Sequence, residues 1–332
     1  MESIIEKLRG KRILITGATG LIGSNIIRLC TKVNDTPGAP IQIIAQVRNL
    51  EKAQKLFGTN INLKYVICDI VDDLQISSEV DYIIHCASQT SSRMFVEEPV
   101  ETIEIAVQGT KNILEFAKRK NVKSIVYLST MEVYGAPITE DKINEKHETN
   151  INTMEVRSSY PESKRLCESL CCAYCAEYDL PIKVLRLTQT FGTGVSYNDT
   201  RVFAEFARCA IESKDIVLHT KGETKRSYLD VDDAVNAIVN VLLKGENGQA
   251  YNAANEDTFC SIYEMAQMVA NDCANNAIKV MIETGEADSF GYAPTLKMNL
   301  DTSKLRALGW KPKRELKEMF TSMIKYMQEN KK

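Results

Sequence analysis

Residues 16–23 read Thr-Gly-Ala-Thr-Gly-Leu-Ile-Gly, and this stretch decides the fold. It follows a short run of branched apolar residues, Arg12 to Thr16, and opens a segment with helical apolar spacing, Leu21 to Lys32. Its three glycines allow a tight turn, close approach of the backbone to a pyrophosphate and close packing of helix on strand. The helix N-terminus would offer unpaired N–H groups and a partial positive charge to phosphates. We therefore predict a strand, a phosphate-binding turn and a helix.

Segments with strand and helix character alternate from this motif onward. The apolar runs are short and apolar on both faces, as buried parallel strands are. We predict an α/β fold with a doubly wound parallel sheet, whose ligands bind at the carboxyl ends of the strands. The predicted strands are 12–16, 41–47, 63–68, 80–85, 124–128 and 182–187, and the predicted helices include 21–32, 100–120 and 161–178.

The alternation loosens after the sixth strand. Residues 191–201 are rich in glycine and polar residues and residues 271–294 are irregular and polar, whereas 230–251 returns to a helix followed by a strand. We therefore predict a dinucleotide-binding domain and a smaller substrate-binding region that caps the sheet. The domain comprises residues 1–187 and 230–255, and the smaller region comprises 188–229 and 256–332.

The composition excludes several classes of function. Of the 332 residues, 44% are hydrophobic and 26% charged, which is typical of a globular protein. The net charge of −3 gives no electrostatic reason to expect a nucleic acid or an anionic membrane as partner. No apolar run approaches the roughly 20 residues that span a bilayer, and residues 1–12 lack the apolar core of a signal peptide. We expect a cytoplasmic protein.

Ten cysteines raise the question of a metal site or of disulfides. Cys167, Cys171 and Cys175 recur at every fourth residue, on one stripe of a predicted helix. A zinc site usually draws its ligands from two separated pairs, and the sequence has no second pair of that kind. We expect the stripe to pack against apolar residues, with no metal and no disulfides.

The end of the second predicted strand bears on the choice between NAD and NADP. An acidic residue there would bind the adenosine ribose hydroxyls and repel a 2′-phosphate. The sequence has Gln46-Val47-Arg48-Asn49 instead, and Arg48 could pair with the 2′-phosphate of NADP. The alternative is a solvated arginine at the start of the next helix, so NADP is only slightly favoured. Asp69, just after the third strand, is a candidate acceptor for the adenine amino group.

Tyr160 and Lys164 lie at i and i+4 on one face of a predicted helix. A tyrosine with a pKa of about 10 is a poor base near neutral pH, and a neighbouring ammonium group lowers that pKa. The end of the fifth strand supplies a hydroxyl partner in Thr130. Thr130 would bind a substrate oxygen while Tyr160 moves the proton.

With these motifs the chain resembles the extended short-chain dehydrogenases/reductases, the NAD-dependent epimerase/dehydratase family, over nearly its full length. The family's glycine signature matches residues 17–23, and its fourth-strand signature matches residues 85–88, His-Cys-Ala-Ser. Its Ser/Thr–Tyr–Lys triad falls on Thr130, Tyr160 and Lys164. The resemblance implies a Rossmann-like dinucleotide-binding domain.

Three further stretches narrow the resemblance to nucleotide-sugar enzymes, particularly those similar to UDP-glucuronate decarboxylase. They are residues 198–202 (NDTRV), 225–233 (KRSYLDVDD) and 300–304 (LDTSK) running on to 308–312 (LGWKP). In that family the arginines of the first two stretches approach the nucleotide diphosphate, which suits forked donors facing phosphate oxygens. The resemblance gives that role to Arg201 and Arg226.

The sequence also departs from the family's patterns. The family's 4,6-dehydratases carry an acidic pair where this chain has Met131-Glu132, and methionine cannot protonate a leaving hydroxyl at C6, so the sequence disfavours dehydration. The decarboxylases often have serine in place of Met131, although Glu132 is retained. Arg48 stands where members that use NAD usually have aspartate, which resembles the family's NADPH-consuming reductases.

The resemblance implies hydride transfer between the sugar C4 and a nicotinamide, with Tyr160 handling the hydroxyl proton and Lys164 also holding the nicotinamide ribose. An NDP-sugar epimerase or decarboxylase is the first prediction, followed closely by an NADPH-dependent NDP-4-ketosugar reductase, and then by a 4,6-dehydratase. A non-catalytic dinucleotide-sensing protein is the remote alternative, disfavoured because the triad is complete.

These interpretations define three sets of site residues. The expected catalytic residues are Thr130, Glu132, Tyr160 and Lys164. The expected substrate-binding residues are Thr130, Met131, Glu132, Gln189, Arg201 and Arg226. The expected cofactor-binding residues are Gly17, Thr19, Gly20, Leu21, Ile22, Gly23, Arg48, Asp69, Ile70, Ala87, Ser88, Tyr160 and Lys164.

We also predict a homodimer. Helices 100–120 and 161–178 would pair across a two-fold axis and bury the cysteine stripe in a four-helix bundle. The alternative is that the stripe packs on its own sheet.

Overall fold

A seven-stranded parallel sheet forms the centre of the protein, with the strand order β11-β7-β5-β4-β1-β2-β3. The order reverses between β1 and β4, which is the switch point of a doubly wound sheet. The predicted α/β, Rossmann-like fold is therefore confirmed. The strands are β1 (Arg12–Thr16), β2 (Gln42–Val47), β3 (Leu63–Ile67), β4 (Tyr82–His85), β5 (Ser124–Thr130), β7 (Ile182–Leu187) and β11 (Ala250–Ala253).

The computed structural model describes residues 2–148, 150–284 and 295–331. The predicted irregular segment 271–294 therefore lies in part outside the described residues. Within its described part, β13 (Val280–Ile282) pairs in parallel with β9 (Ile216–Leu218).

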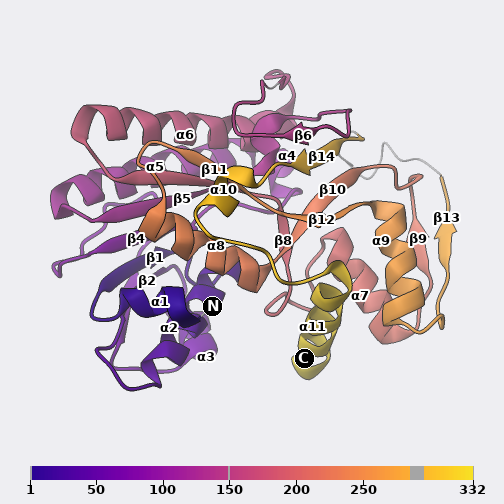
Figure 1. Cartoon of the computed structure of the whole chain (residues 1–332), viewed down its shortest axis with the longest axis horizontal. Coiled ribbons are helices and arrows are strands. Elements are labelled where there is room, and N and C mark those ends of the chain that lie inside the picture. Colours follow the sequence, from indigo (N-terminus) through magenta and orange to yellow (C-terminus); the bar gives the residue numbers. More distant parts are fainter. Residues whose placement is uncertain (1, 149, 285–294, 332) are drawn as a thin grey trace.

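Helices cover both faces of the large sheet (Figure 1). On one face, α2 (Leu21–Asn34) and α8 (Val231–Lys244) form a continuous apolar core with the strands. On the other face, α5 (Pro99–Lys120) and α6 (Ser159–Tyr178) form a second core. The shorter elements of this part are α1 (Glu2–Ile5), η1 (Glu6–Leu8), α3 (Leu50–Phe57) and α4 (Met94–Glu97).

Local sequence explains the ends of the two long helices. Pro99 occupies the first turn of α5, where its missing N–H group breaks no helical hydrogen bond. Asn121 ends that helix with φ 49°, and Asp179 ends α6 with φ 54°. Short polar side chains of this kind tolerate the left-handed conformation of a helix C-terminus.

A smaller five-stranded sheet lies beside the large one. Its strand order is β12-β10-β14-β6, and β8 also pairs with β10. Phenylalanines and methionines of the surrounding helices form a separate core. The elements of this part are η2 (Met131–Tyr134), β6 (Lys142–Ile143), η3 (Val156–Ser158), β8 (Gln189–Phe191), α7 (Val202–Glu212), β10 (Lys225–Asp230), β12 (Asn255–Ser261), α9 (Ile262–Met268), η4 (Val269–Cys273), β14 (Lys297–Leu300), α10 (Ser303–Ala307) and α11 (Leu316–Glu329).

Each of the two parts includes short segments from the sequence range that was predicted for the other. The two-residue strand β6, from the predicted dinucleotide-binding segment, pairs with β14 in the smaller sheet. Conversely, Leu305 and Trp310, from the predicted substrate-binding segment, pack in the core around α2 and α8. The carboxyl ends of the large sheet thus face a second part that is built from several stretches of sequence.

The cysteine stripe of α6 packs inside its own chain. Cys167 and Cys171 are buried in the core between α5, α6 and the sheet, and the Cys167 thiol donates to the Ala106 carbonyl with an S–O distance of 3.2 Å. The expectation that a partner subunit buries this stripe is therefore wrong, because α5 and the sheet already cover it.

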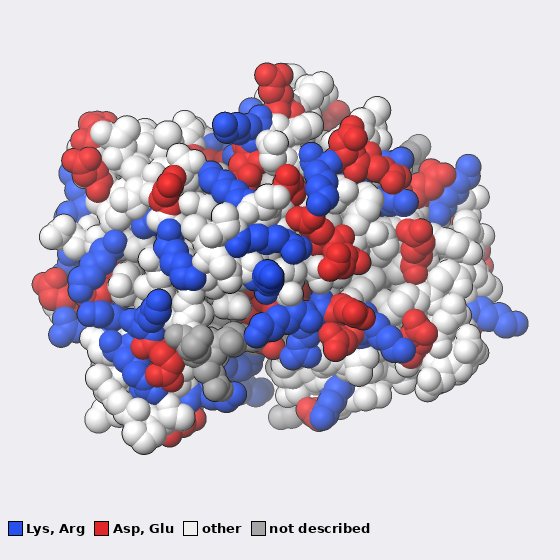
Figure 2. All heavy atoms as spheres, in the orientation of Figure 1, with Lys and Arg blue, Asp and Glu red and all other residues white. Residues whose placement is uncertain are grey.

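The surface carries both signs of charge. Figure 2 shows lysines and arginines interspersed with aspartates and glutamates over the face in view. Among the helices in the described part of the chain, none is long and apolar enough to cross a membrane.

Candidate active site

The glycine turn after β1 is packed too closely for side chains. A Cβ atom on Gly23 would lie 2.5 Å from the Gly17 carbonyl oxygen, and one on Gly17 would lie 2.8 Å from the Ala87 nitrogen. Gly17 has a φ of +61°, and its N–H donates to the Gln46 side chain over 3.1 Å. Gly20 is the N-cap residue of α2 and supplies no side-chain cap, so no capping side chain of its own covers the first N–H groups of the helix, at Leu21 and Ile22. This cradle suits a pyrophosphate.

The residues after β2 and β3 lie next to each other. The Arg48 side chain is 72% exposed, and its Nη1 lies 3.9 Å from Oδ2 of Asp69. Ile70 is buried and would contact a Cβ atom placed on Gly109 of α5. Arg48 and Asp69, the two residues predicted to bind the adenosine part of the cofactor, therefore lie together at the exposed ends of β2 and β3.

His85 braces the carboxyl ends of β1 and β4. Its Nδ1 lies 2.7 Å from Thr16 Oγ1, and its Nε2 lies 3.3 Å from Thr110 Oγ1 on α5. Burial, assisted by the charge of Lys164, lowers the pKa of His85 to about 3, so the imidazole is neutral near pH 7. Thr16 also accepts the N–H of Ala87 over 3.1 Å, which holds Ala87 and Ser88 at the switch point.

Tyr160 and Lys164 lie in the first turns of α6, against the carboxyl end of β5. Lys164 Nζ donates to the Leu128 carbonyl over 2.8 Å and lies 6.0 Å from the centre of the Tyr160 ring. Burial lowers the pKa of Lys164. Burial also raises the pKa of Tyr160, the charge of Glu132 raises it further, and a hydrogen bond with Thr130 opposes these shifts. The predicted triad is thus brought together.

The predicted electrostatics of the triad are wrong in one respect. We expected Lys164 to keep the pKa of Tyr160 low, whereas burial dominates and raises it. The charge that lowers the pKa of Tyr160 is that of Arg157, whereas the Lys164 ammonium group donates to the Leu128 carbonyl on β5.

The two residues after Thr130 differ in environment. Glu132 is partly exposed, and its Oε2 accepts a hydrogen bond from Arg157 Nη1 over 2.8 Å. Met131 is buried in a small apolar cluster, with its sulfur 3.3 Å from Thr188 Oγ1. Of the two, only Glu132 carries an ionisable side chain that is partly exposed, whereas Met131 is buried among apolar residues.

The predicted substrate residues of the smaller part fall into two groups. Arg226 on β10 donates to the Gln189 side chain on β8 over 3.3 Å. Its Nε is buried and has no hydrogen-bond partner among the described residues. Arg201 instead pairs with Asp199, with an Nη2–Oδ2 distance of 2.6 Å. A buried guanidinium nitrogen without a partner suits an anionic ligand.

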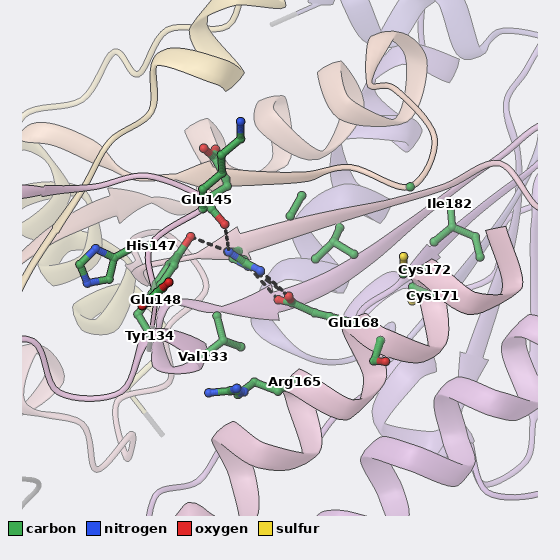
Figure 3. Close-up of a pocket in the computed structure, with 16 residues that line it drawn as sticks. Val133, Tyr134, Glu145, His147, Glu148, Arg165, Glu168, Cys171, Cys172 and Ile182 are labelled. Carbon is green, nitrogen blue, oxygen red and sulfur yellow. Dashed lines mark hydrogen bonds and ion pairs between the residues drawn. The ribbon is translucent and has the colours of Figure 1, made fainter. Parts of the chain in front are cut away.

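A cavity of about 750 Å³ lies between α6, the β7–β11 edge and the segment around residues 145–148 (Figure 3). In it, Glu168 extends from α6 toward Tyr134 and Glu145. Arg186 joins them, because it binds Glu168 over 2.6 Å and the Tyr134 hydroxyl over 2.7 Å. The lining of this cavity contains none of the triad residues, so we place the candidate active site at the glycine turn and the triad.

Sequence reasoning missed several residues that lie at this site or next to it. Glu168 continues the spacing of Tyr160 and Lys164 by one further turn, and that signal could have identified it. Arg157 and Phe95 gave no such signal, because they approach Glu132 and Tyr160 only in the folded chain.

Comparisons with known proteins bear on the family to which this chain is related. The model of the NAD dependent epimerase/dehydratase family matches residues 13–254. The chain is 29% identical to UDP-glucuronic acid decarboxylase 1 of Danio rerio over 95% of its own length and 72% of the relative. It is 31% identical to UDP-glucuronic acid decarboxylase 3 of Arabidopsis thaliana, over 92% and 86% of the two chains.

Among solved structures, UDP-glucose 4-epimerase of Thermus thermophilus in complex with NAD is similar in fold. It matches with a TM-score of 0.78 and 21% identity, over 96% of this chain and 99% of that chain. The family model covers well over half of the sequence and includes the glycine turn and the triad. The chain therefore belongs to the NAD dependent epimerase/dehydratase family.

Proposed function

We propose that the protein modifies a nucleotide-diphosphate sugar by hydride transfer at the sugar C4, as an epimerase or a decarboxylase. The observation that carries the proposal is the contact of the Tyr160 and Thr130 hydroxyls at the carboxyl end of β5, beside Glu132. The names of the relatives, which are UDP-glucuronic acid decarboxylases, support the substrate class.

The two parts of the chain would divide the binding of the reactants. The glycine turn and the corner of Arg48 and Asp69 fit a nicotinamide dinucleotide, the cofactor class present in the Thermus structure. Arg226, with its unpartnered Nε, would bind the sugar nucleotide's diphosphate, and Arg201 would join it by releasing Asp199.

The side chains of the site suit the proposed first step. When bound, the nicotinamide accepts the hydride of the sugar C4 and can return it. Thr130 would orient the C4 hydroxyl and Tyr160 would take its proton, so that a C4 ketone forms. Lys164 would hold the nicotinamide ribose from the buried side of α6. Alignment of both reactants supplies much of the rate.

The fate of the C4 ketone distinguishes the candidate reactions. A C5 carboxylate beside such a ketone can leave as CO2, with its electron pair kept in a C4–C5 enolate. Glu132 would pass a proton to C5, and return of the hydride to C4 would then complete the decarboxylation. Return of hydride to the opposite face of the ketone without loss of CO2 would be epimerisation. The apolar setting of Met131 gives no acid for loss of a C6 hydroxyl, which is why we do not favour dehydration.

We propose NADP over NAD on the strength of Arg48. Its side chain is 72% exposed and comes no nearer than 3.9 Å to Asp69, so it is free to turn to a 2′-phosphate. If NADPH exchanges freely in the purified protein, the 4-ketosugar reductase becomes the better assignment.

We also propose a homodimer. Val100 and Ile103 of α5 and Leu166 of α6 are between 42% and 61% exposed, so these helices present apolar side chains outward even though the cysteine stripe is covered. We propose a cytoplasmic location as well. All ten cysteines are free thiols, which suits a reducing compartment.

The proposed substrate class predicts selective stabilisation by nucleotide sugars. We expect a UDP-, CDP-, GDP- or dTDP-linked sugar to raise the melting temperature, because a ligand that binds only the native state stabilises it. Incubation with the best ligand should then release CO2 or yield the C4 epimer, with cofactor retained by the protein. A panel in which no nucleotide sugar shifts the melting temperature or is converted would contradict the proposed function.

Tyr160→Phe should lower kcat by about 10²–10⁴-fold, the usual contribution of a general base, while the sugar nucleotide still binds. Thr130→Val should lower kcat less, because the base survives. Since burial raises the pKa of Tyr160, kcat/KM of the unmodified protein should rise with pH above neutrality as the phenol ionises. Tyr65→Phe, which removes a hydroxyl bonded to the Gly58 carbonyl, is the control and should turn over normally. Normal turnover by Tyr160→Phe would refute the assigned site.

Arg48→Asp should weaken NADP binding by about 1.5–3 kcal/mol, the typical contribution of a hydrogen bond to a charged group. NAD binding should change little or improve. Lys55→Asp makes the same change of charge on the exposed side of α3 and controls for the effect of the changed net charge on cofactor binding. Equal affinities of the unmodified protein for NAD and NADP, measured by calorimetry, would refute the preference.

Light scattering at micromolar protein should give the mass of two chains. Ile103→Glu, which places a charge on the proposed interface, should shift the mass toward one chain. A single-chain mass for the unmodified protein would rule the dimer out.

A further inference from the structure

Phe95 stacks on Tyr160, and the proposed reaction assigns it no role. The two ring centroids are 4.1 Å apart and the ring planes are within 5° of parallel, closer than the roughly 4.5–7 Å typical of aromatic pairs. Phe95 is 1% exposed and Tyr160 is 8% exposed. The phenyl ring therefore covers one face of the proposed base and keeps water from it.

A backbone contact fixes the same two segments to each other. The Ser159 hydroxyl donates to the Phe95 carbonyl over 2.9 Å in buried surroundings. Because Ser159 directly precedes Tyr160, the hydrogen bond and the ring contact hold neighbouring residues of α6 against α4. The Tyr160 ring cannot turn about its own axis without losing contact with Phe95.

Arg157 connects this aromatic pair to Glu132. Its guanidinium carbon lies 5.6 Å from the centre of the Phe95 ring, within the range of attraction between a cation and a ring face. The same guanidinium donates to Glu132 over 2.8 Å. Phe95 thus contacts both the proposed base and the cation that holds the second proton-handling group.

We propose that Phe95 is a positioning residue that sets the ring plane of Tyr160 and, through Arg157, the place of Glu132. It touches neither substrate nor cofactor in this role. The proposal rests on the proposed function because that function gives Tyr160 the proton of the C4 hydroxyl. The stack keeps the phenol hydroxyl aimed at Thr130 and keeps one face of the ring dry.

Two separate effects follow from removal of the phenyl ring. The freed Tyr160 ring would sample other orientations, so fewer bound substrates would be aligned for reaction. Water would reach the exposed ring face, and since burial is the main cause of the raised pKa of Tyr160, that pKa would fall toward its ordinary value. A falling pKa moves the rise of kcat/KM to lower pH.

The test compares Phe95→Leu with Phe116→Leu. Phe116 on α5 is also 1% exposed and lies in the core between α5, α6 and the large sheet, so it controls for the loss of a buried ring. Phe95→Leu should lower kcat about 10–100-fold, as misalignment of a reactive group does, with KM nearly unchanged and the pH profile displaced by about half a unit or more to lower pH. Phe116→Leu should reduce only stability to urea. Phe95→Tyr, which restores a ring, should recover most of the lost kcat.

The ionisation of Tyr160 can be measured without turnover. In protein carrying 13C-labelled tyrosine, the signal that Tyr160→Phe removes reports this titration directly. A lower midpoint in Phe95→Leu supports the proposal even if no nucleotide sugar is converted, so failure of the proposed function stays distinguishable. An unchanged midpoint together with an unchanged kcat would overturn the proposal, as would equal changes in Phe95→Leu and Phe116→Leu.

Discussion

Arg186 is the side chain on which the packing of α6 and η2 against the carboxyl end of β7 depends. From β7 it binds both carboxylate oxygens of Glu168 on α6, the Tyr134 hydroxyl in η2 and the Glu145 carbonyl. An ion pair withdrawn from water is stable only when such further hydrogen bonds complete it, and Ser129 on β5 donates one to Glu168 over 2.5 Å. The ion pair of Arg186 and Glu168 thereby joins β7, β5, the helix that carries Tyr160 and Lys164, and the turn that carries Glu132.

Burial of the side chains at the carboxyl ends of these strands changes their pKa values. Three titratable groups around the triad are shifted chiefly by burial, which lowers the pKa of His85 and Lys164 and raises that of Tyr160. Each shift favours the neutral form. Burial therefore keeps His85 neutral near pH 7 and disfavours charge on Tyr160 and Lys164, whereas Glu132 and Arg157 form their ion pair at the rim of the site.

Local signals in the sequence were sufficient for the large sheet. The glycine turn and the alternating apolar runs depend on neighbouring residues, and β1, β2 and β7 fall within one residue of their predicted limits. The pairing of Tyr160 with Lys164 was predictable for the same reason. The two-residue strand β6 has too short a pattern to recognise, and the contact of Ser159 with Phe95 joins residues 64 positions apart. The sequence did not give the degree to which individual side chains are buried. Burial raises the pKa of Tyr160, contrary to the prediction, and burial against α5 and the sheet covers the cysteine stripe.

The late position of β11 in the chain bears on how the protein is made. This strand completes the edge of the large sheet beside β7, yet it comes from residues 250–253, after the chain has passed through α7 and the strands of the smaller part. A ribosome therefore exposes β7 with one side unpaired for as long as it takes to synthesise more than sixty further residues. Unpaired strand edges on incomplete chains promote association between molecules. The interval between the emergence of β7 and that of β11 is thus a stage of biosynthesis at which the nascent chain is open to association with its neighbours.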